Sequence, residues 1–132
     1  MEDLYALGAK CFDRICAYHY DIDRGAATKG IVHFTDDAVF EAQGKRYEGR
    51  DGVMSFLTNR EAQTDRHTVH VITGPRFSRG DDGSLLVGTI ILISVRDAEG
   101  QYTISKAVDT VHRFVETRDG WLIASRLSKP LH

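Results

Sequence analysis

Residues 18–50 read YHYDIDRGAATKGIVHFTDDAVFEAQGKRYEGR. The stretch starts within a helix and ends that helix on the polar run Asp23-Arg24-Gly25, while Asp36-Asp37 further on is typical of a turn. The elements predicted after the first helix are a second helix over 26–33, a strand over 38–43 and a short strand over 46–48. The pattern therefore places an acidic helix end near strands, an arrangement that can form a small-molecule site.

Helical periodicity extends this pattern toward the N-terminus, over residues 3–22. The apolar stripe of that helix contains Leu4, Gly8, Cys11, Ile15, Tyr18 and Ile22. A third helix is predicted over 51–62. From residue 66 the period changes to two, which is typical of strands, and the four strands predicted there are 66–79, 84–96, 101–116 and 121–128. Gly74-Pro75 predicts a bulge in the first of them.

The order of helices followed by a long antiparallel meander indicates the α+β class. The 132 residues predict a single domain over 1–132. Strands of this length that curve around the long N-terminal helix can enclose a cavity, and bends at glycines supply the curvature.

Composition excludes several classes of function. Apolar residues make up 42% of the chain, enough for one core, and the net charge of −2 comes from scattered charges rather than from a basic face. We therefore expect no nucleic-acid partner. The longest apolar stretch, Leu85 to Val95, is too short to span a bilayer, and the first residues do not resemble a signal peptide. We expect no membrane partner and a cytoplasmic protein.

Cysteine spacing agrees with that compartment. Cys11 and Cys16 lie five apart on the predicted helix, so their side chains point in different directions. We expect two small buried hydrophobic residues and no disulfide, as in a reducing environment.

Asp23 and His67 are the first candidates for chemistry. A carboxylate at a helix C-terminus is unfavourable with the helix dipole, so Asp23 either caps the next helix or serves a pocket. Alternation on the strand puts His67, Val69 and Val71 on one face and Thr68, His70 and Ile72 on the other. Both faces contain apolar residues, so the alternation leaves open which one is inside. It does argue against a metal site made by the two histidines.

Other polar residues offer weaker patterns. His19 and Asp23 are four apart on the helix and can pair. Tyr18 lies on the apolar stripe, so its hydroxyl needs a partner, which inside a cavity can be a ligand. Asp109 and Arg126, on neighbouring predicted strands, are expected to form an ion pair. The sequence contains no nucleophile elbow, phosphate loop or dinucleotide fingerprint.

The order of these elements resembles a known family. Its marks are Tyr18, Asp23, Phe34-Thr35-Asp36-Asp37-Ala38-Val39, Tyr47-Glu48-Gly49-Arg50, Arg66-His67 and Asp119-Gly120-Trp121. Over roughly residues 5–128 the chain is similar to the SnoaL-like group of the nuclear transport factor 2-like superfamily. The resemblance implies a curved antiparallel sheet wrapped with the long N-terminal helix and two further helices into a cone. It also implies a ligand pocket at the wide end and a homodimer or homotrimer.

Within that superfamily the site pattern is most similar to that of scytalone dehydratase. The resemblance implies a catalytic pair in which His67 moves a proton and Asp23 orients the ring. It implies ligand contacts from Tyr18, which matches the oxyanion tyrosine of ketosteroid isomerase, and from Ile22, Phe40, Ala42 and Thr110. The dehydratase tyrosines fall on Ile22 and Ala42, and the isomerase base also falls on Ala42.

We therefore expect an enzyme of lyase or isomerase type, similar to dehydratases or polyketide cyclases. The expected substrate is a small, hydrophobic, oxygenated molecule, and the expected chemistry uses no metal and no cofactor. The alternative is a non-catalytic ligand-binding module or a partner subunit resembling the small subunit of ring-hydroxylating dioxygenases. Ile22 and Ala42 favour this alternative because neither side chain can polarise a substrate.

Overall fold

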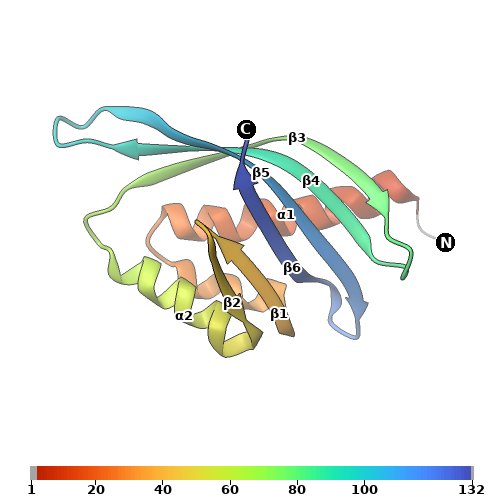
Figure 1. Cartoon of the computed structure of the whole chain (residues 1–132). Helices are drawn as coiled ribbons and strands as arrows, with labels where there is room; N and C mark the ends of the chain where they lie inside the picture. The colour runs from red at the N-terminus through yellow and green to blue at the C-terminus, as the bar shows by residue number, and fades with distance from the viewer. Residues whose placement is uncertain (1–2, 132) are drawn as a thin grey trace.

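The structure, a computed structural model, describes residues 3–131. The elements are α1 (Leu4–Asp23), the 3₁₀ helix η1 (Ala27–His33), β1 (Phe34–Ala42), β2 (Lys45–Glu48), α2 (Gly49–Ala62), β3 (Thr68–Arg79), β4 (Leu85–Arg96), β5 (Tyr102–Thr117) and β6 (Gly120–Pro130). Figure 1 shows the long strands arching over the helices. The predicted α+β order, with a long first helix and two further helical segments, is confirmed.

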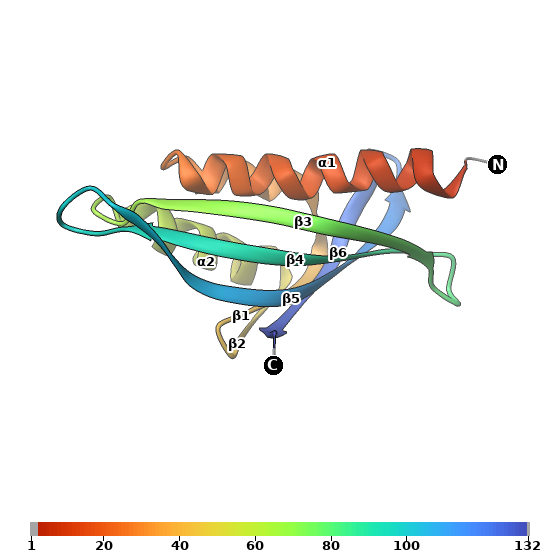
Figure 2. The ribbon, with the colours of Figure 1, turned by 90° about the horizontal axis from the view of Figure 1, so that it is seen from above.

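Helix α1 forms where the apolar stripe predicts it. The Asp3 carboxylate caps its first turn by accepting a hydrogen bond from the Ala6 amide at 3.3 Å. Gly25, with φ of 77°, follows its C-terminal end. Figure 2 shows the helix running along β3. The two elements lie so close that a Cβ on Gly8 would come within 2.5 Å of the Phe77 ring.

The six strands form one curved sheet in the order β2-β1-β6-β5-β4-β3. Four of its five pairings are antiparallel, but β1 and β6 run parallel, so the sheet is mixed. The register of β1 against β6 shifts between Phe34 and Val39. Asp36-Asp37 lies in this irregular segment. These two residues were expected to form a turn before the strand, but they lie inside β1, where they interrupt its pairing with β6.

The bulge predicted at Gly74-Pro75 is present. The pairing of β3 with β4 shifts between Thr73 and Arg76, and Gly74 has φ of 64°. One extra residue reverses the alternation of side chains. As a result, even-numbered residues of β3 face the core before the bulge and Phe77 faces it afterwards.

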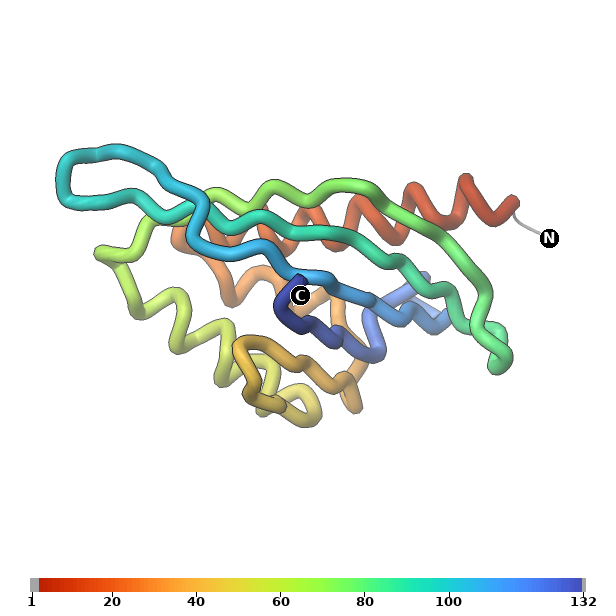
Figure 3. The backbone as a smooth tube through the Cα atoms, turned by 45° about the horizontal axis from the view of Figure 1, so that its top comes forward, coloured from red at the N-terminus to blue at the C-terminus, as the bar shows by residue number. Residues whose placement is uncertain are grey.

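The core lies between α1 and the inner face of the sheet. The largest fully buried side chains include Tyr18, Phe40 and Phe114. Cys11 is buried, Cys16 is partly buried, and no disulfide joins them. Figure 3 shows the β4–β5 hairpin extending beyond the rest of the sheet, next to the segment between α2 and β3. None of the helices within residues 3–131 is both long and apolar enough to cross a bilayer.

Candidate functional site

Two adjoining cavities open between the inner face of the sheet, α2 and the β1–β2 hairpin. The helix-side cavity, of about 310 Å³, is lined among others by His19 and Ile22 of α1, Tyr47, Arg60 and Thr68. The strand-end cavity, of about 510 Å³, is lined among others by Ala42, Ala107, Val108 and Pro130. The residues that line both are Gln43, Phe56, His70, Ile93 and Arg126. These volumes suit a small ligand.

Asp23 joins the end of α1 to the start of β3. Its carboxylate accepts hydrogen bonds from the Thr68 hydroxyl at 2.8 Å, the His70 amide at 2.8 Å and His70 Nδ1 at 2.6 Å. Helix η1 begins after Ala26 without any side-chain cap. Of the two roles left open for Asp23, capping is therefore not seen. The carboxylate instead bonds to Thr68 and His70, which line the helix-side cavity, while Asp23 itself lines neither cavity.

The Asp23–His70 pair is well shielded, because each side chain is only 12% exposed. Burial by itself raises the pKa of Asp23. The hydrogen bonds and charge of His70, with the Thr68 hydroxyl, outweigh burial and hold that pKa below its usual 3.8. An ionised carboxylate only accepts, so His70 Nδ1 carries a proton, and Nε2 is the nitrogen that has the lone pair when the ring is neutral. Within residues 3–131, Nε2 of His70 has no hydrogen-bond partner.

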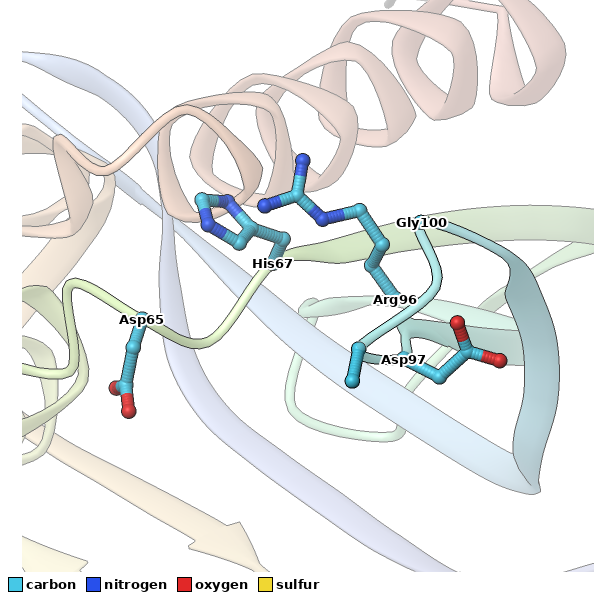
Figure 4. Close-up of a pocket in the computed structure, with 6 residues that line it drawn as sticks. Asp65, His67, Arg96, Asp97 and Gly100 are labelled. Carbon is cyan, nitrogen blue, oxygen red and sulfur yellow. The ribbon is translucent and has the colours of Figure 1, made fainter.

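The expected pairing of Asp23 with His67 is corrected by this geometry. His67 precedes the first residue of β3, and its backbone carbonyl accepts the Arg96 amide at 3.0 Å. Its side chain lines a separate hollow at the β4–β5 hairpin, together with Asp65, Arg96 and Asp97. Figure 4 shows the Asp65 and Asp97 carboxylates pointing away from the His67 ring. Because Thr68 and His70 share the inner face of β3, the histidine three residues later takes the place expected for His67.

His19 lies beside His70 but does not pair with Asp23. The ring centroids of the two histidines are 4.8 Å apart. His19 Nδ1 donates to the Ile15 carbonyl at 2.8 Å, which leaves Nε2 as the unprotonated ring nitrogen. Burial, followed by the charges of His70 and Arg126, lowers the pKa of His19 well below 6.5. The helix-side cavity therefore contains a neutral imidazole, His19, beside His70, and the two rings have different orienting partners.

Tyr18 forms a second buried pair with His112, a residue for which the sequence offered no pattern. The Tyr18 hydroxyl is 2.6 Å from His112 Nε2, and both side chains are fully buried. Burial raises the pKa of Tyr18 to about 12, and burial together with the charge of Arg126 lowers the pKa of His112 well below 6.5. The tyrosine therefore stays protonated and donates to the imidazole.

The residues expected to contact a ligand divide into two groups. Ile22 and Phe40 line the helix-side cavity, and Ala42 lines the strand-end cavity. Tyr18 and Thr110 are buried and line neither. The Thr110 hydroxyl has no hydrogen-bond partner among the described residues.

Arg126 faces both cavities and does not pair with Asp109. In the register of β5 and β6 it lies opposite His112, whereas Asp109 lies opposite Lys129. The predicted cross-strand ion pair is therefore wrong, because Asp109 and Arg126 are three residues out of register. The guanidinium donates to the Glu41 carbonyl at 2.8 Å and lies 4.6 Å from the centre of the Phe40 ring.

Sequence reasoning missed His70, His112 and Arg126 as members of one buried region. The signal for His70 was the choice of inner face on β3, and a single strand does not provide it. His112 and Arg126 required the register of two strands. Within residues 3–131, no three His, Cys, Asp or Glu side chains group as metal ligands would.

Comparison with known proteins agrees with the cone-shaped fold. An NTF2-like protein with a cystatin-like fold from Novosphingobium aromaticivorans superposes with a TM-score of 0.78 at 17% identity, covering 99% of this chain and 92% of that one. ActVI-ORFA from Streptomyces coelicolor superposes with a TM-score of 0.82 at 19% identity, covering 98% and 96%. A Catenulispora acidiphila protein, solved in complex with S-DNPA, gives a TM-score of 0.82 at 21% identity, covering 96% and 94%.

At these identities the structural neighbours show the fold alone. A search of curated protein sequences finds no significant match. The family model described as the SnoaL-like domain matches residues 10–127, which is most of the chain and includes Asp23, His70 and Arg126. The chain therefore belongs to the SnoaL-like domain family.

Proposed function

We propose that this protein is a cofactor-independent enzyme of lyase or isomerase type, similar to dehydratases or cyclases, that acts on a small, hydrophobic, oxygenated molecule. The observation that carries the proposal is the Asp23–His70 pair, with His70 lining both cavities. The structural neighbour solved in complex with S-DNPA supports a ligand role for a chain of this fold.

In the proposed reaction, His70 is the general base and acid and Asp23 is its positioning residue. Nε2 takes a proton from a carbon next to a substrate carbonyl, and the electron pair of that C–H bond moves toward the carbonyl to form an enolate. The imidazolium is stabilised by the Asp23 carboxylate. His70 then returns the proton, either to a departing β-hydroxyl, which leaves as water, or to another carbon, which completes an isomerisation.

The second candidate function is ligand binding without catalysis. It is favoured by Ile22 and Ala42, which line the cavities where the dehydratase pattern has tyrosines. In that case the Asp23–His70 pair would serve only to tie α1 to β3.

Proton exchange separates the two functions and does not require the natural substrate. A panel of cyclic and aromatic β-hydroxyketones is incubated with the protein in D₂O, and loss of the α-proton signal is followed by NMR. We expect exchange with the wild type and with His67→Gln, and none with His70→Gln. If the wild type binds panel members without exchanging them, the catalytic proposal fails and the binding function stands.

We also propose that the protein is a homodimer or homotrimer that associates through the outer face of its sheet. Val69 and Val71 of β3, Val111 of β5 and Leu127 of β6 are each between 42% and 46% exposed on that face. Exposed apolar patches of this kind mark interfaces. Light scattering on the wild type and on Val111→Lys tests the proposal, which predicts an oligomer for the first and a smaller species for the second. A monomeric wild type would contradict it.

A further inference from the structure

The charged side chains that line the two cavities are lysines and arginines. Lys45, Arg60, Arg66 and Arg126 line the helix-side cavity, and the strand-end cavity adds Lys106 and Lys129. Among residues 3–131, no Asp or Glu lines either cavity. The chain as a whole has 19 acidic and 17 basic residues. Composition therefore does not account for the excess of cations at the site.

Arg126 is the cation that the fold buries most. Only 6% of the residue is exposed, and its Nε is buried without a hydrogen-bond partner in the described part of the chain. Its side chain donates to neutral oxygens, the Glu41 carbonyl at 2.8 Å and the Ser128 hydroxyl at 3.5 Å. Among residues 3–131, no carboxylate forms an ion pair with it. A buried charge without a counterion is strongly unfavourable.

The groups around Arg126 cannot supply that counterion. His19 and His112 are kept neutral by burial, and the nearby guanidinium lowers the pKa of both further. The Asp23 carboxylate is already occupied by Thr68 and His70. Within residues 3–131, no carboxylate is therefore paired with Arg126, which faces both cavities.

We infer that the ligand of this site carries a carboxylate, which Arg126 binds, with an apolar body that occupies the strand-end cavity. The inference takes from the proposed function only that these cavities hold the ligand. A planar guanidinium matches a carboxylate better than any other side chain does. Phe56, Ile93 and Val108 provide apolar surface for the body of the molecule. Because His70 and Arg126 line the same two cavities, an acid held by Arg126 presents its neighbouring carbons to His70.

The lysines and arginines at the rim have a different role. Lys45, Lys106 and Lys129 are all exposed, and exposed cations around a cleft raise the rate at which anions reach it. Their contribution falls with ionic strength, whereas that of the buried Arg126 is screened much less.

A matched pair of probes tests the inference by binding alone. The probes are 2-naphthoate and 2-naphthamide, which have the same ring system and differ in charge. Binding to the intact protein is measured by NMR titration of backbone amides, with Gln43 and Ile93 as reporters at the site. We expect the acid to bind about tenfold to a hundredfold more tightly than the amide, as for a charge-assisted hydrogen bond in a shielded site.

Variants assign that preference to one residue. Arg126→Met removes the charge, with a flexible apolar chain in its place, and is expected to bring the acid-to-amide ratio to about one to twofold. Arg76→Met, an exposed arginine of β3, is the matched control and is expected to keep the wild-type ratio. If Arg126→Met does not fold, the inference is still tested by the acid-to-amide binding ratio of the wild type and by that of Arg126→Lys, which keeps the charge.

Equal binding of acid and amide by the wild type, or an unchanged ratio in Arg126→Met, overturns the inference and leaves the proposed ligand site intact. Absence of binding by both probes overturns the inference and the ligand site together. A wild-type preference for the acid, combined with absence of proton exchange in the catalytic assay, retains the inference and removes only the catalytic step.

Discussion

His67 and His70 are three residues apart in the chain, yet the structure places them in different surroundings. His70 lies on the inner face of β3, bonded to Asp23 and lining both cavities. His67 lies before the strand begins and lines a hollow at a hairpin, where the nearby carboxylates point away from it. A histidine becomes a candidate base through the carboxylate that orients it, and the phase of the strand decides which histidine meets that carboxylate.

The largest expected effect is on catalysis. Once a substrate has been found by the exchange screen, His70→Gln is expected to lower kcat by about 10²- to 10⁴-fold, the range for loss of a general base. His67→Gln is the matched control, and we expect its kcat to stay within about twofold of the wild type. Steady-state kinetics of the two variants measure the difference, and a larger loss in His67→Gln would reverse the comparison.

Asp23→Asn is expected to affect both activity and stability. The amide can donate to His70 Nδ1, which favours the tautomer with the proton on Nε2 and removes the base. Loss of the charged acceptor for Thr68 and His70 is expected to lower the free energy of unfolding by about 1–3 kcal/mol.

Asp65→Asn, at the hollow that His67 lines, is the control for Asp23→Asn. Asp65 is exposed and forms no ion pair within residues 3–131, so its loss is expected to change stability by less than about 0.5 kcal/mol. Urea denaturation of both variants gives the comparison. Equal losses would mean that Asp23 does no more for the fold than a surface carboxylate.

The lowered pKa of Asp23 also fixes the direction of its pH dependence. The folded pKa lies below the usual 3.8, so the unfolded chain binds this proton more readily. The ionised Asp23 carboxylate therefore stabilises the fold fully above its usual pKa, and this stabilisation is lost as the pH falls through its pKa in the folded state. Asp23→Asn should therefore remove part of the acid sensitivity in that range, while Asp65→Asn should not.

Buried histidines produce a second pH effect, at higher pH. The folded pKa values of His19 and His112 lie well below 6.5, so below this pH the unfolded chain takes up protons that the folded chain does not. These two histidines therefore do not lower the free energy of unfolding above about pH 6.5. Below that pH the free energy of unfolding falls, by up to about 1.4 kcal/mol per pH unit for each histidine.

The double variant Tyr18→Phe/His112→Phe tests the contribution of one of these histidines. It removes both partners of the buried hydrogen bond and leaves His19 in place, so the slope of stability against pH should fall by about 1.4 kcal/mol per pH unit. Tyr18→Phe alone is the control that keeps the titrating group. Urea titrations between pH 7.5 and 5 give the slopes, and identical slopes would show that His112 is not held neutral.

The smallest expected effect concerns the bulge that sets the phase of β3. Gly74 has φ of 64°, which costs an L-residue about 1–2 kcal/mol. Gly74→Ala is therefore expected to destabilise the protein by about 1 kcal/mol, measured by thermal unfolding. Gly88, on β4 without positive φ and with open space at its Cβ, is the control position, and Gly88→Ala is not expected to show this backbone strain.

The sequence predicted the fold better than the site, for a physical reason. Periodicity and turn residues predicted the helices, the long strands and the bulge at Gly74-Pro75, because each depends on local backbone preferences. Asp23 stood out because a carboxylate is unfavourable where α1 ends. The partner of Asp23 depended on which face of β3 is buried, and that follows only from packing against α1.

Arg126 illustrates the same limit for the sheet. Its assignment to Asp109 assumed a register that differs by three positions from the pairing of β5 with β6. Its position between both cavities further depends on Phe40 and Glu41 of β1, a strand that joins β6 in parallel although the two are far apart in the chain. Contacts this distant in sequence are not coded by local periodicity.

NMR of the histidine side-chain nitrogens, in wild-type protein and in Asp23→Asn, identifies the histidine that Asp23 orients without any need for a substrate. We predict that the His70 ring, assigned with His70→Gln, is protonated on Nδ1 with a strongly hydrogen-bonded proton. We also predict that Asp23→Asn abolishes this signal and leaves the His67 ring unchanged. A response to Asp23→Asn at His67, with none at His70, would show that the pairing of Asp23 with His70 is wrong.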